Sequence, residues 1–103
     1  MKVFLSPLAE RKVLMLLNYI EQEWSMGSKE EFLAKLKGKF DQISKHPHSC
    51  IKSHVFPKLF KCTVTKQTSF YYRIVTDGIE IITVIDNRQD PKKTFEEITK
   101  FFT

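Results

Sequence analysis

Apolar and polar residues follow two different rhythms along this chain, and the first rhythm predicts helices. From Ala9 to Trp24, apolar residues recur every three or four positions, which is the spacing of an amphipathic helix. Leu14 and Met15 widen this apolar stripe, so we expect the helix to be more buried than a surface helix. Ser6-Pro7 provides a favoured N-cap and a favoured first helical residue. Residues 2–5 before it are predicted to form a short strand.

A second helix is predicted directly after the first. Gly27 suits the left-handed residue that ends many helices. Ser28 and Glu31 have the spacing of a capping box, in which each side chain accepts a hydrogen bond from the other residue's backbone N–H. His46-Pro47 should end this helix. Because the connection is short, the two helices are predicted to form an antiparallel hairpin. The apolar stripe of the second helix comprises Phe32, Leu33, Leu36, Phe40 and Ile43.

The second half of the chain changes to the period of two that is typical of strands. Residues 59–65, 68–76 and 79–86 are predicted to be strands, the last a central one because both of its faces are apolar. Asp77-Gly78 lies between two of them and predicts a tight hairpin turn with positive φ at both central residues.

The remaining segments are weaker in pattern. Residues 48–58 are predicted to be irregular or to hold a short strand within 51–55, and the tail is predicted to be a short helix capped by Asp90 or Thr94. We therefore expect a single α+β domain over residues 1–103. It should contain an N-terminal strand, a helical hairpin, a mostly antiparallel sheet with three to four further strands, and a short C-terminal helix. The helices should lie on one face of the sheet.

Charge and composition limit the function classes. The net charge is +5, and it is uneven, since residues 1–43 carry seven Lys and Arg against six Asp and Glu, whereas residues 44–103 carry ten against six. This bias suits a polyanion or an acidic protein partner, and it is equally typical of a soluble surface. No apolar run approaches the ~18 residues of a membrane span, and the first residues do not form a secretory signal. We therefore expect a cytoplasmic protein in which Cys50 and Cys62 stay reduced, with Cys62 in the core.

Residues in five places together resemble the RelE/ParE superfamily of toxins from type II toxin–antitoxin modules. They are Leu5-Ser6-Pro7, Ala9-Glu10, Leu59 to Cys62, Tyr71 to Ile74 and Ile85 to Pro91, so the resemblance covers roughly residues 2–91. It implies a growth-inhibiting, plasmid-stabilising toxin without a cofactor. It also implies a cognate antitoxin that wraps a concave basic surface of the toxin in a hetero-oligomer.

The resemblance leaves two targets open, because some members cleave messenger RNA on the ribosome and others inhibit DNA gyrase. Cleavage at the RNA 2′-OH needs a base, an acid and cations on the phosphate. The candidates are the cations Lys61, Lys66, Arg73 and Arg88 and the proton donor Tyr71. However, Ser69 stands where some nuclease members carry arginine, and no His or Tyr follows Ile85. We therefore favour the gyrase-inhibiting ParE branch over a metal-independent endoribonuclease. A plain nucleic-acid-binding module is a third hypothesis.

The same five candidates could bind the antitoxin or the target, and each also has a plain structural interpretation. By alternation, Tyr71 should be exposed and Tyr72 should be in the core. Arg73 could pair with Glu80 or Asp86, and Arg88 with Asp86 or Asp90, while Lys61 and Lys66 could be solvated lysines. The spacing of His46, His48, Cys50 and His54 does not match a zinc finger, so no metal site is predicted.

Overall fold

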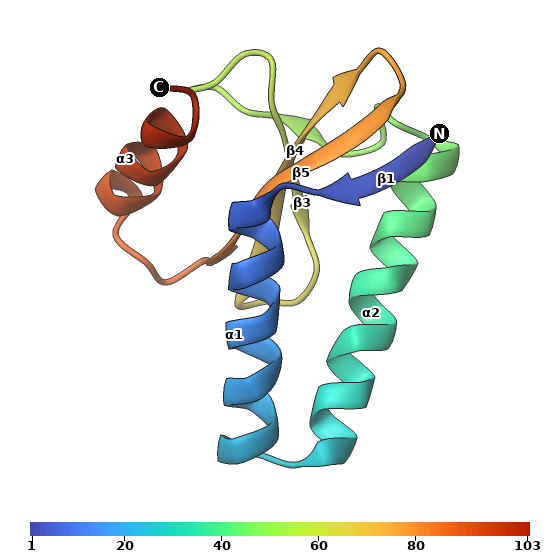
Figure 1. Ribbon diagram of the computed structural model, residues 1–103, viewed down its shortest axis with the longest axis vertical. Coiled ribbons are helices and arrows are strands. Elements are labelled where there is room, and N and C mark those ends of the chain that lie inside the picture. The colour runs from blue at the N-terminus through green and yellow to red at the C-terminus, as the bar shows by residue number, and fades with distance from the viewer.

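The computed structural model describes all residues 1–103, and it is α+β as predicted (Figure 1). Its elements are β1 (Lys2–Leu5), α1 (Pro7–Glu23), α2 (Met26–Lys45), β2 (Ile51–Lys52), β3 (Phe60–Thr63), β4 (Thr68–Val75), β5 (Gly78–Asp86) and α3 (Pro91–Phe101). The strands form one sheet in the order β1-β5-β4-β3-β2. Only the β1–β5 pair is parallel, so β5 lies inside the sheet, as the sequence predicted.

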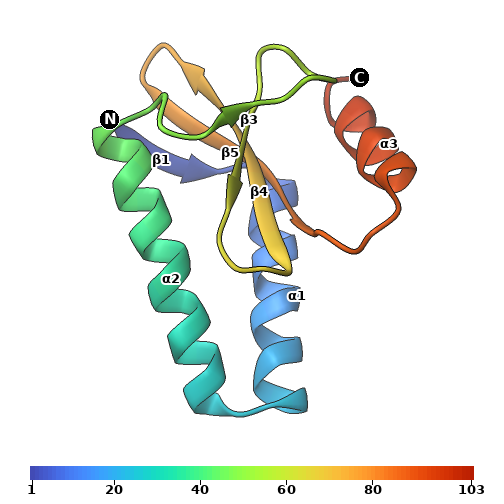
Figure 2. The ribbon, with the colours of Figure 1, turned by 180° about the vertical axis from the view of Figure 1, so that it is seen from behind.

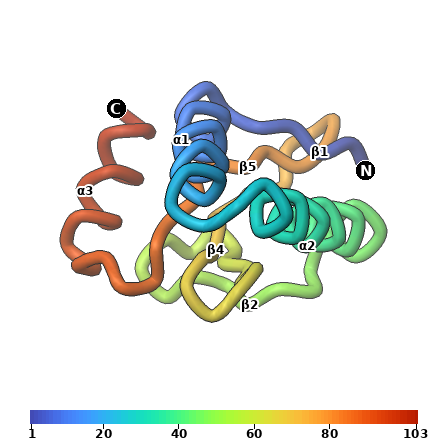
Figure 3. The backbone as a smooth tube through the Cα atoms, turned by 90° about the horizontal axis from the view of Figure 1, so that it is seen from below, coloured from blue at the N-terminus to red at the C-terminus, as the bar shows by residue number.

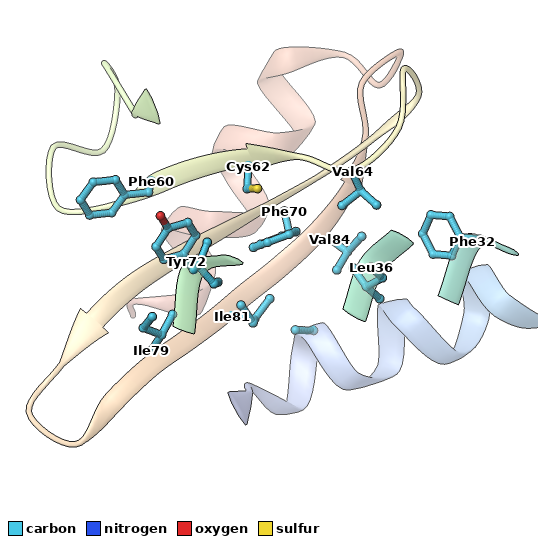
Figure 4. Packing of buried hydrophobic residues seen from close by; sticks show 12 residues of the cluster. Phe32, Leu36, Phe60, Cys62, Val64, Phe70, Tyr72, Ile79, Ile81 and Val84 are labelled. Carbon is cyan, nitrogen blue, oxygen red and sulfur yellow. The ribbon is translucent and has the colours of Figure 1, made fainter. Parts of the chain in front are cut away.

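Two apolar clusters hold the elements together, one on each face of the sheet. The larger cluster lies between the sheet and the α1–α2 hairpin and includes Leu36, Phe70 and Tyr72 (Figure 4). The smaller cluster joins Leu59 and Ile82 to Ile98 of α3. The prediction that all helices share one face was therefore wrong for α3, which packs against the other face and lies on the side of α1 away from α2 (Figure 3). A bulge in β5 contributes to this arrangement, because Tyr71 pairs with Thr83 and Tyr72 with Ile81, which leaves Ile82 as the extra residue.

Ser6 joins the first strand to the first helix, as the sequence predicted. Its hydroxyl accepts a hydrogen bond from the Ala9 N–H at 3.0 Å and donates one to the Ile82 carbonyl at 2.7 Å. Its own N–H donates to the Ile81 carbonyl at 2.9 Å. The cap of α1 is thus also the contact that fixes α1 beside the middle of β5.

The junction between the two helices differs from the prediction. Ser25 caps α2, and its hydroxyl accepts from the Ser28 N–H at 3.0 Å, so Gly27 and Ser28 lie inside the first helical turn. Gly27 does not have a positive φ, and the Ser28–Glu31 capping box does not form. Ser25 and Ser28 are both favourable N-cap residues, and because the connection between the helices is short, α2 begins after the earlier serine.

The β4–β5 turn also differs from the expected geometry. Its two loop residues are Thr76 and Asp77, and Gly78 already pairs with Val75 as the first residue of β5. No residue in the chain has a positive φ. Gly78 instead lies against β1, because a Cβ at this position would lie 2.4 Å from the Lys2 carbonyl oxygen. The approach of β1, and not the turn, requires the glycine.

Candidate functional site

The structure separates the five predicted site residues into two groups. Lys61, Tyr71 and Arg73 lie on β3 and β4, with Lys61 and Tyr71 directly paired. Lys66 lies in the β3–β4 turn and Arg88 in the segment after β5, at the other end of the sheet. No single surface therefore gathers all five residues.

The first group lies where α3 covers the sheet. Tyr71 is half-buried against the small cluster of Leu59, Ile82 and Ile98, so the expectation that it is exposed was wrong. Burial raises the pKa of Tyr71, since the phenolate would lose contact with water. Alternation correctly placed Tyr71 on the face opposite Tyr72, but it could not show that a helix covers that face.

Arg73 is engaged by its neighbours in the same region. Its Nε atom lies 2.7 Å from Oε1 of Glu80, which is its directly opposite residue on β5. Its guanidinium carbon lies 5.1 Å from the ring centroid of Phe102, within the range of a cation–π contact. The predicted Arg73–Glu80 pair is thus confirmed, and it leaves Arg73 less available to an incoming phosphate.

A carboxylate fastens α3 to the rest of the fold. Glu97 lies 2.9 Å from the Lys12 Nζ atom of α1 and accepts a hydrogen bond from the Thr83 hydroxyl of β5. The helix begins at Pro91, and the Asp90 side chain accepts from the Lys92 N–H at 3.0 Å, so Asp90 is the cap. Asp90 therefore fixes the start of α3, and Glu97 holds the helix to α1 and β5.

The second group lies at the end of the sheet beside α1. Arg88 pairs with Asp86, with distances of 3.0 Å from Nε to Oδ1 and 2.8 Å from Nη2 to Oδ2. These hydrogen bonds lower the pKa of Asp86 from its ordinary value. The Lys66 carbonyl accepts from the Asn87 side chain at 3.2 Å, which ties the β3–β4 turn to the segment carrying Arg88. The Lys66 ammonium group is exposed and has no carboxylate partner.

A groove adjoins this second group, at a place that the sequence did not indicate. It has a volume of about 760 Å³ and lies between α1, the first turns of α2, the β3–β4 turn and the end of β5. It exists because the helical hairpin extends well past the sheet, which leaves the inner side of its far half uncovered (Figures 1 and 2). Both Lys66 and Arg88 line it.

Large apolar side chains are exposed in this groove. Trp24 is 74% exposed, Met15 63% and Tyr19 56%, and all three line it. The expectations that Trp24 belongs to the apolar stripe that packs inward, and that Leu14 and Met15 make α1 more buried than a surface helix, were therefore wrong. The helical period places such residues on a helix face, but it does not say where the sheet beneath that face ends. The sequence did hold a signal for this exposed apolar surface, because the first helix has more apolar residues than a single buried stripe needs.

The histidine and cysteine residues do not form a metal site. No three His, Cys, Asp or Glu side chains lie close enough to hold an ion. Cys62 is 2% exposed and belongs to the main core cluster, as predicted. None of the helices combines the length and apolar character needed to cross a membrane.

Comparison with known proteins supports the resemblance seen in the sequence. The model of the family described as the ParE toxin of the type II toxin–antitoxin system parDE matches residues 3–91. No curated protein is similar enough to count as a relative. The match spans β1 to the end of β5 and ends at Pro91, where α3 begins.

Proposed function

Because the chain belongs to the ParE toxin family of type II toxin–antitoxin systems, we propose that it inhibits bacterial growth by binding DNA gyrase and is neutralised by a cognate antitoxin. The observation that carries the choice of target is the separation of the candidate catalytic groups. Tyr71 lies under α3, Arg73 is paired with Glu80, and Lys66 and Arg88 lie at the other end of the sheet.

This separation counts against an endoribonuclease. Such an enzyme needs its base, its acid and its cations within hydrogen-bond reach of one phosphate. Here the one tyrosine among the candidates is half-buried with a raised pKa, and the nearest candidate arginine is held by a carboxylate 2.7 Å away. A toxin that acts by binding a protein needs no such cluster, so the arrangement supports the gyrase-binding branch.

The groove beside α1 is the surface that best suits the antitoxin. Exposed aromatic side chains such as Trp24 and Tyr19 are the kind of residue that anchors protein interfaces. Four cations and two anions line the groove. Three of the cations are paired with carboxylates of the chain, so Lys66 is the cation left to attract an acidic partner. The cations are Lys12, Lys35, Lys66 and Arg88, and the anions are Glu31 and Asp86. An antitoxin segment with apolar anchors flanked by acidic residues would complement it.

The target is tested by expressing the chain alone in bacteria, mapping the ends of cellular RNA, and assaying supercoiling by gyrase with the purified protein. We expect supercoiling to fall while messages stay intact. Codon-positioned cuts that disappear with Arg73→Ala, but persist with the exposed-lysine control Lys52→Ala, would overturn the gyrase proposal in favour of the ribonuclease. Growth arrest with neither effect would also contradict gyrase as the target.

The antitoxin surface is tested with the product of an adjacent open reading frame as the binding partner. Trp24→Ala should weaken that complex by more than about tenfold, because loss of an aromatic anchor costs about 2 kcal/mol or more. Ile51→Ala is the matched control, since Ile51 is also highly exposed and apolar but lies on β2, outside the groove. A complex that is weakened by Ile51→Ala and unaffected by Trp24→Ala would place the antitoxin elsewhere.

A further inference from the structure

The two cysteines of the chain lie near the edge of the sheet, with Cys50 directly before β2 and Cys62 within β3. β2 and β3 are antiparallel, with Ile51 paired to Lys61 and Lys52 to Phe60. One further step in this register places Cys50 opposite Cys62. The side chain of Cys50 packs against the core cluster that contains Cys62.

We propose that Cys50 and Cys62 form a thiol–disulfide site, which a low-molecular-weight disulfide such as oxidised glutathione closes into a cross-strand bond. Directly opposite residues of an antiparallel pair have Cα atoms about 4.5–5.5 Å apart, within the range of about 4.4–6.8 Å that disulfides span. Because opposite residues also point to the same face, their sulfur atoms can meet without moving the strands. Both thiols are free in the structure, which is therefore the reduced form.

Exposure sets the order of the two steps. Cys50 is half-buried and Cys62 is buried, so Cys50 meets the reagent first. The Cys50 thiolate attacks one sulfur of oxidised glutathione and releases the first glutathione thiolate, which takes up a proton. Cys62 then loses its proton and attacks the Cys50 sulfur, which expels the second glutathione. Two protein thiols are oxidised, and one glutathione disulfide is reduced to two glutathione thiols.

Cys62 is suited to the second step and not to the first. Burial, followed by the contact with Cys50, raises the pKa of Cys62 to about 12. The nearby Lys39 ammonium opposes this shift. A thiol of that kind reacts poorly with a reagent in solution, whereas attack on a mixed disulfide held beside it is intramolecular.

The bond would fasten a segment that is weakly held in the reduced form. β2 pairs with β3 through two residues only, and it is the outermost strand. The enclosed residues, 50–62, include Phe56, whose ring stacks on Phe95 of α3 with centroids 5.4 Å apart, and Leu59, which packs against Ile98. Oxidation would therefore make the part of the chain that supports α3 more rigid.

The test uses the purified full-length protein in glutathione redox buffers, with the products trapped and their intact mass measured. We expect a monomer that has lost two hydrogen atoms, retains no glutathione, and is restored by reduction. Cys62→Ala should leave one stable glutathione on Cys50, whereas Cys50→Ser should leave Cys62 unreacted. Wild-type protein that keeps its glutathione, forms only intermolecular dimers, or does not react would overturn the proposal.

A second measurement on the wild-type chain does not depend on either variant folding. Amide hydrogen exchange in residues 50–62 should slow on oxidation, while exchange in α1 should stay the same, because the bond closes only this segment. Equal exchange rates in the oxidised and reduced proteins would contradict the proposal that the bond makes residues 50–62 more rigid.

Discussion

At the scale of single residues, Gly78 lies so close to β1 that no side chain fits between them. An added Cβ would lie 2.4 Å from the carbonyl oxygen and 3.3 Å from the carbonyl carbon of Lys2, and both atoms belong to a paired strand. We expect Gly78→Ala to lower the free energy of unfolding by about 1–3 kcal/mol, because the strands must separate to admit the methyl group. Urea unfolding measures this loss.

Gly38→Ala is the matched control for this prediction. Gly38 lies within α2, is exposed, and has no atom within 4 Å of an added Cβ. Since alanine is the better helix former, this change should raise stability by about 0.5–1 kcal/mol. The two alanine variants should therefore shift in opposite directions, and a Gly78→Ala protein as stable as wild type would contradict the close approach of β1.

At the scale of elements, the Ser6 cap both begins α1 and joins this helix to β5. Ser6 is buried, and Ser6→Ala leaves the Ala9 N–H without its acceptor and the Ile82 carbonyl without its donor. We expect a loss of about 2–3 kcal/mol in urea unfolding. Ser25→Ala, at the exposed cap of α2, should cost about 1 kcal/mol or less. Equal losses would mean that the Ser6 contact with β5 contributes nothing.

The docking of α3 gives a second prediction at this scale. Ile98 is fully buried with Leu59 and Ile82, so Ile98→Ala should lower the free energy of unfolding by about 2–5 kcal/mol. If docking of α3 contributes less than this, the variant should instead lose only the docking of α3. Hydrogen exchange distinguishes the two cases, because undocking exposes the α3 amides alone. Thr99→Ala, on the exposed side of α3, should neither lower stability nor speed exchange, because it removes no buried contact and alanine is the better helix former. Unaltered stability and exchange in Ile98→Ala would contradict the packing of α3.

The elements show why sequence predicted some features and not others. Ser6-Pro7 is a local signal with no competitor nearby, and it was confirmed, whereas Ser25 and Ser28 offer the same chemistry three residues apart and only the packing of the hairpin decides between them. Alternation placed Tyr72 in the core correctly. The Ile82 bulge and the face that α3 chooses depend on contacts between distant segments, which no local pattern carries.

At the scale of the whole molecule, the sequence predicted the ion pairs of the candidate residues but not where these residues lie relative to one another. The Arg73–Glu80 pair follows from the hairpin register, and the Arg88–Asp86 pair from their closeness in sequence, so both were foreseen. The division of the five candidates between two ends of the sheet, and the groove beside α1, arise from where α3 docks and how far the hairpin extends. These are global properties, and they decide which surfaces a partner can reach.

The fold as a whole should lose stability in alkaline solution, because burial raises the pKa of several acidic side chains. The pKa of Cys62 is raised from 9.0 to about 12, and those of Tyr71 and Tyr72 are raised above 10.0. The folded state therefore keeps protons that the unfolded state releases. Their stabilising contribution is complete below about pH 9 and is lost as the pH rises toward about 12. Urea unfolding of the reduced protein across this range should show a falling free energy.

Cys62→Ala isolates one group in this titration. It removes the most strongly buried thiol and leaves both tyrosines, so the fall in unfolding free energy above about pH 9 should become shallower by the equivalent of up to one proton. Absorbance of tyrosinate reports the remaining groups, and Tyr72 should ionise only as the chain unfolds, since its hydroxyl donates to the Pro47 carbonyl at 2.7 Å within the core. If the wild-type and Cys62→Ala proteins fall with the same slope, Cys62 is not held as a neutral thiol in the folded state.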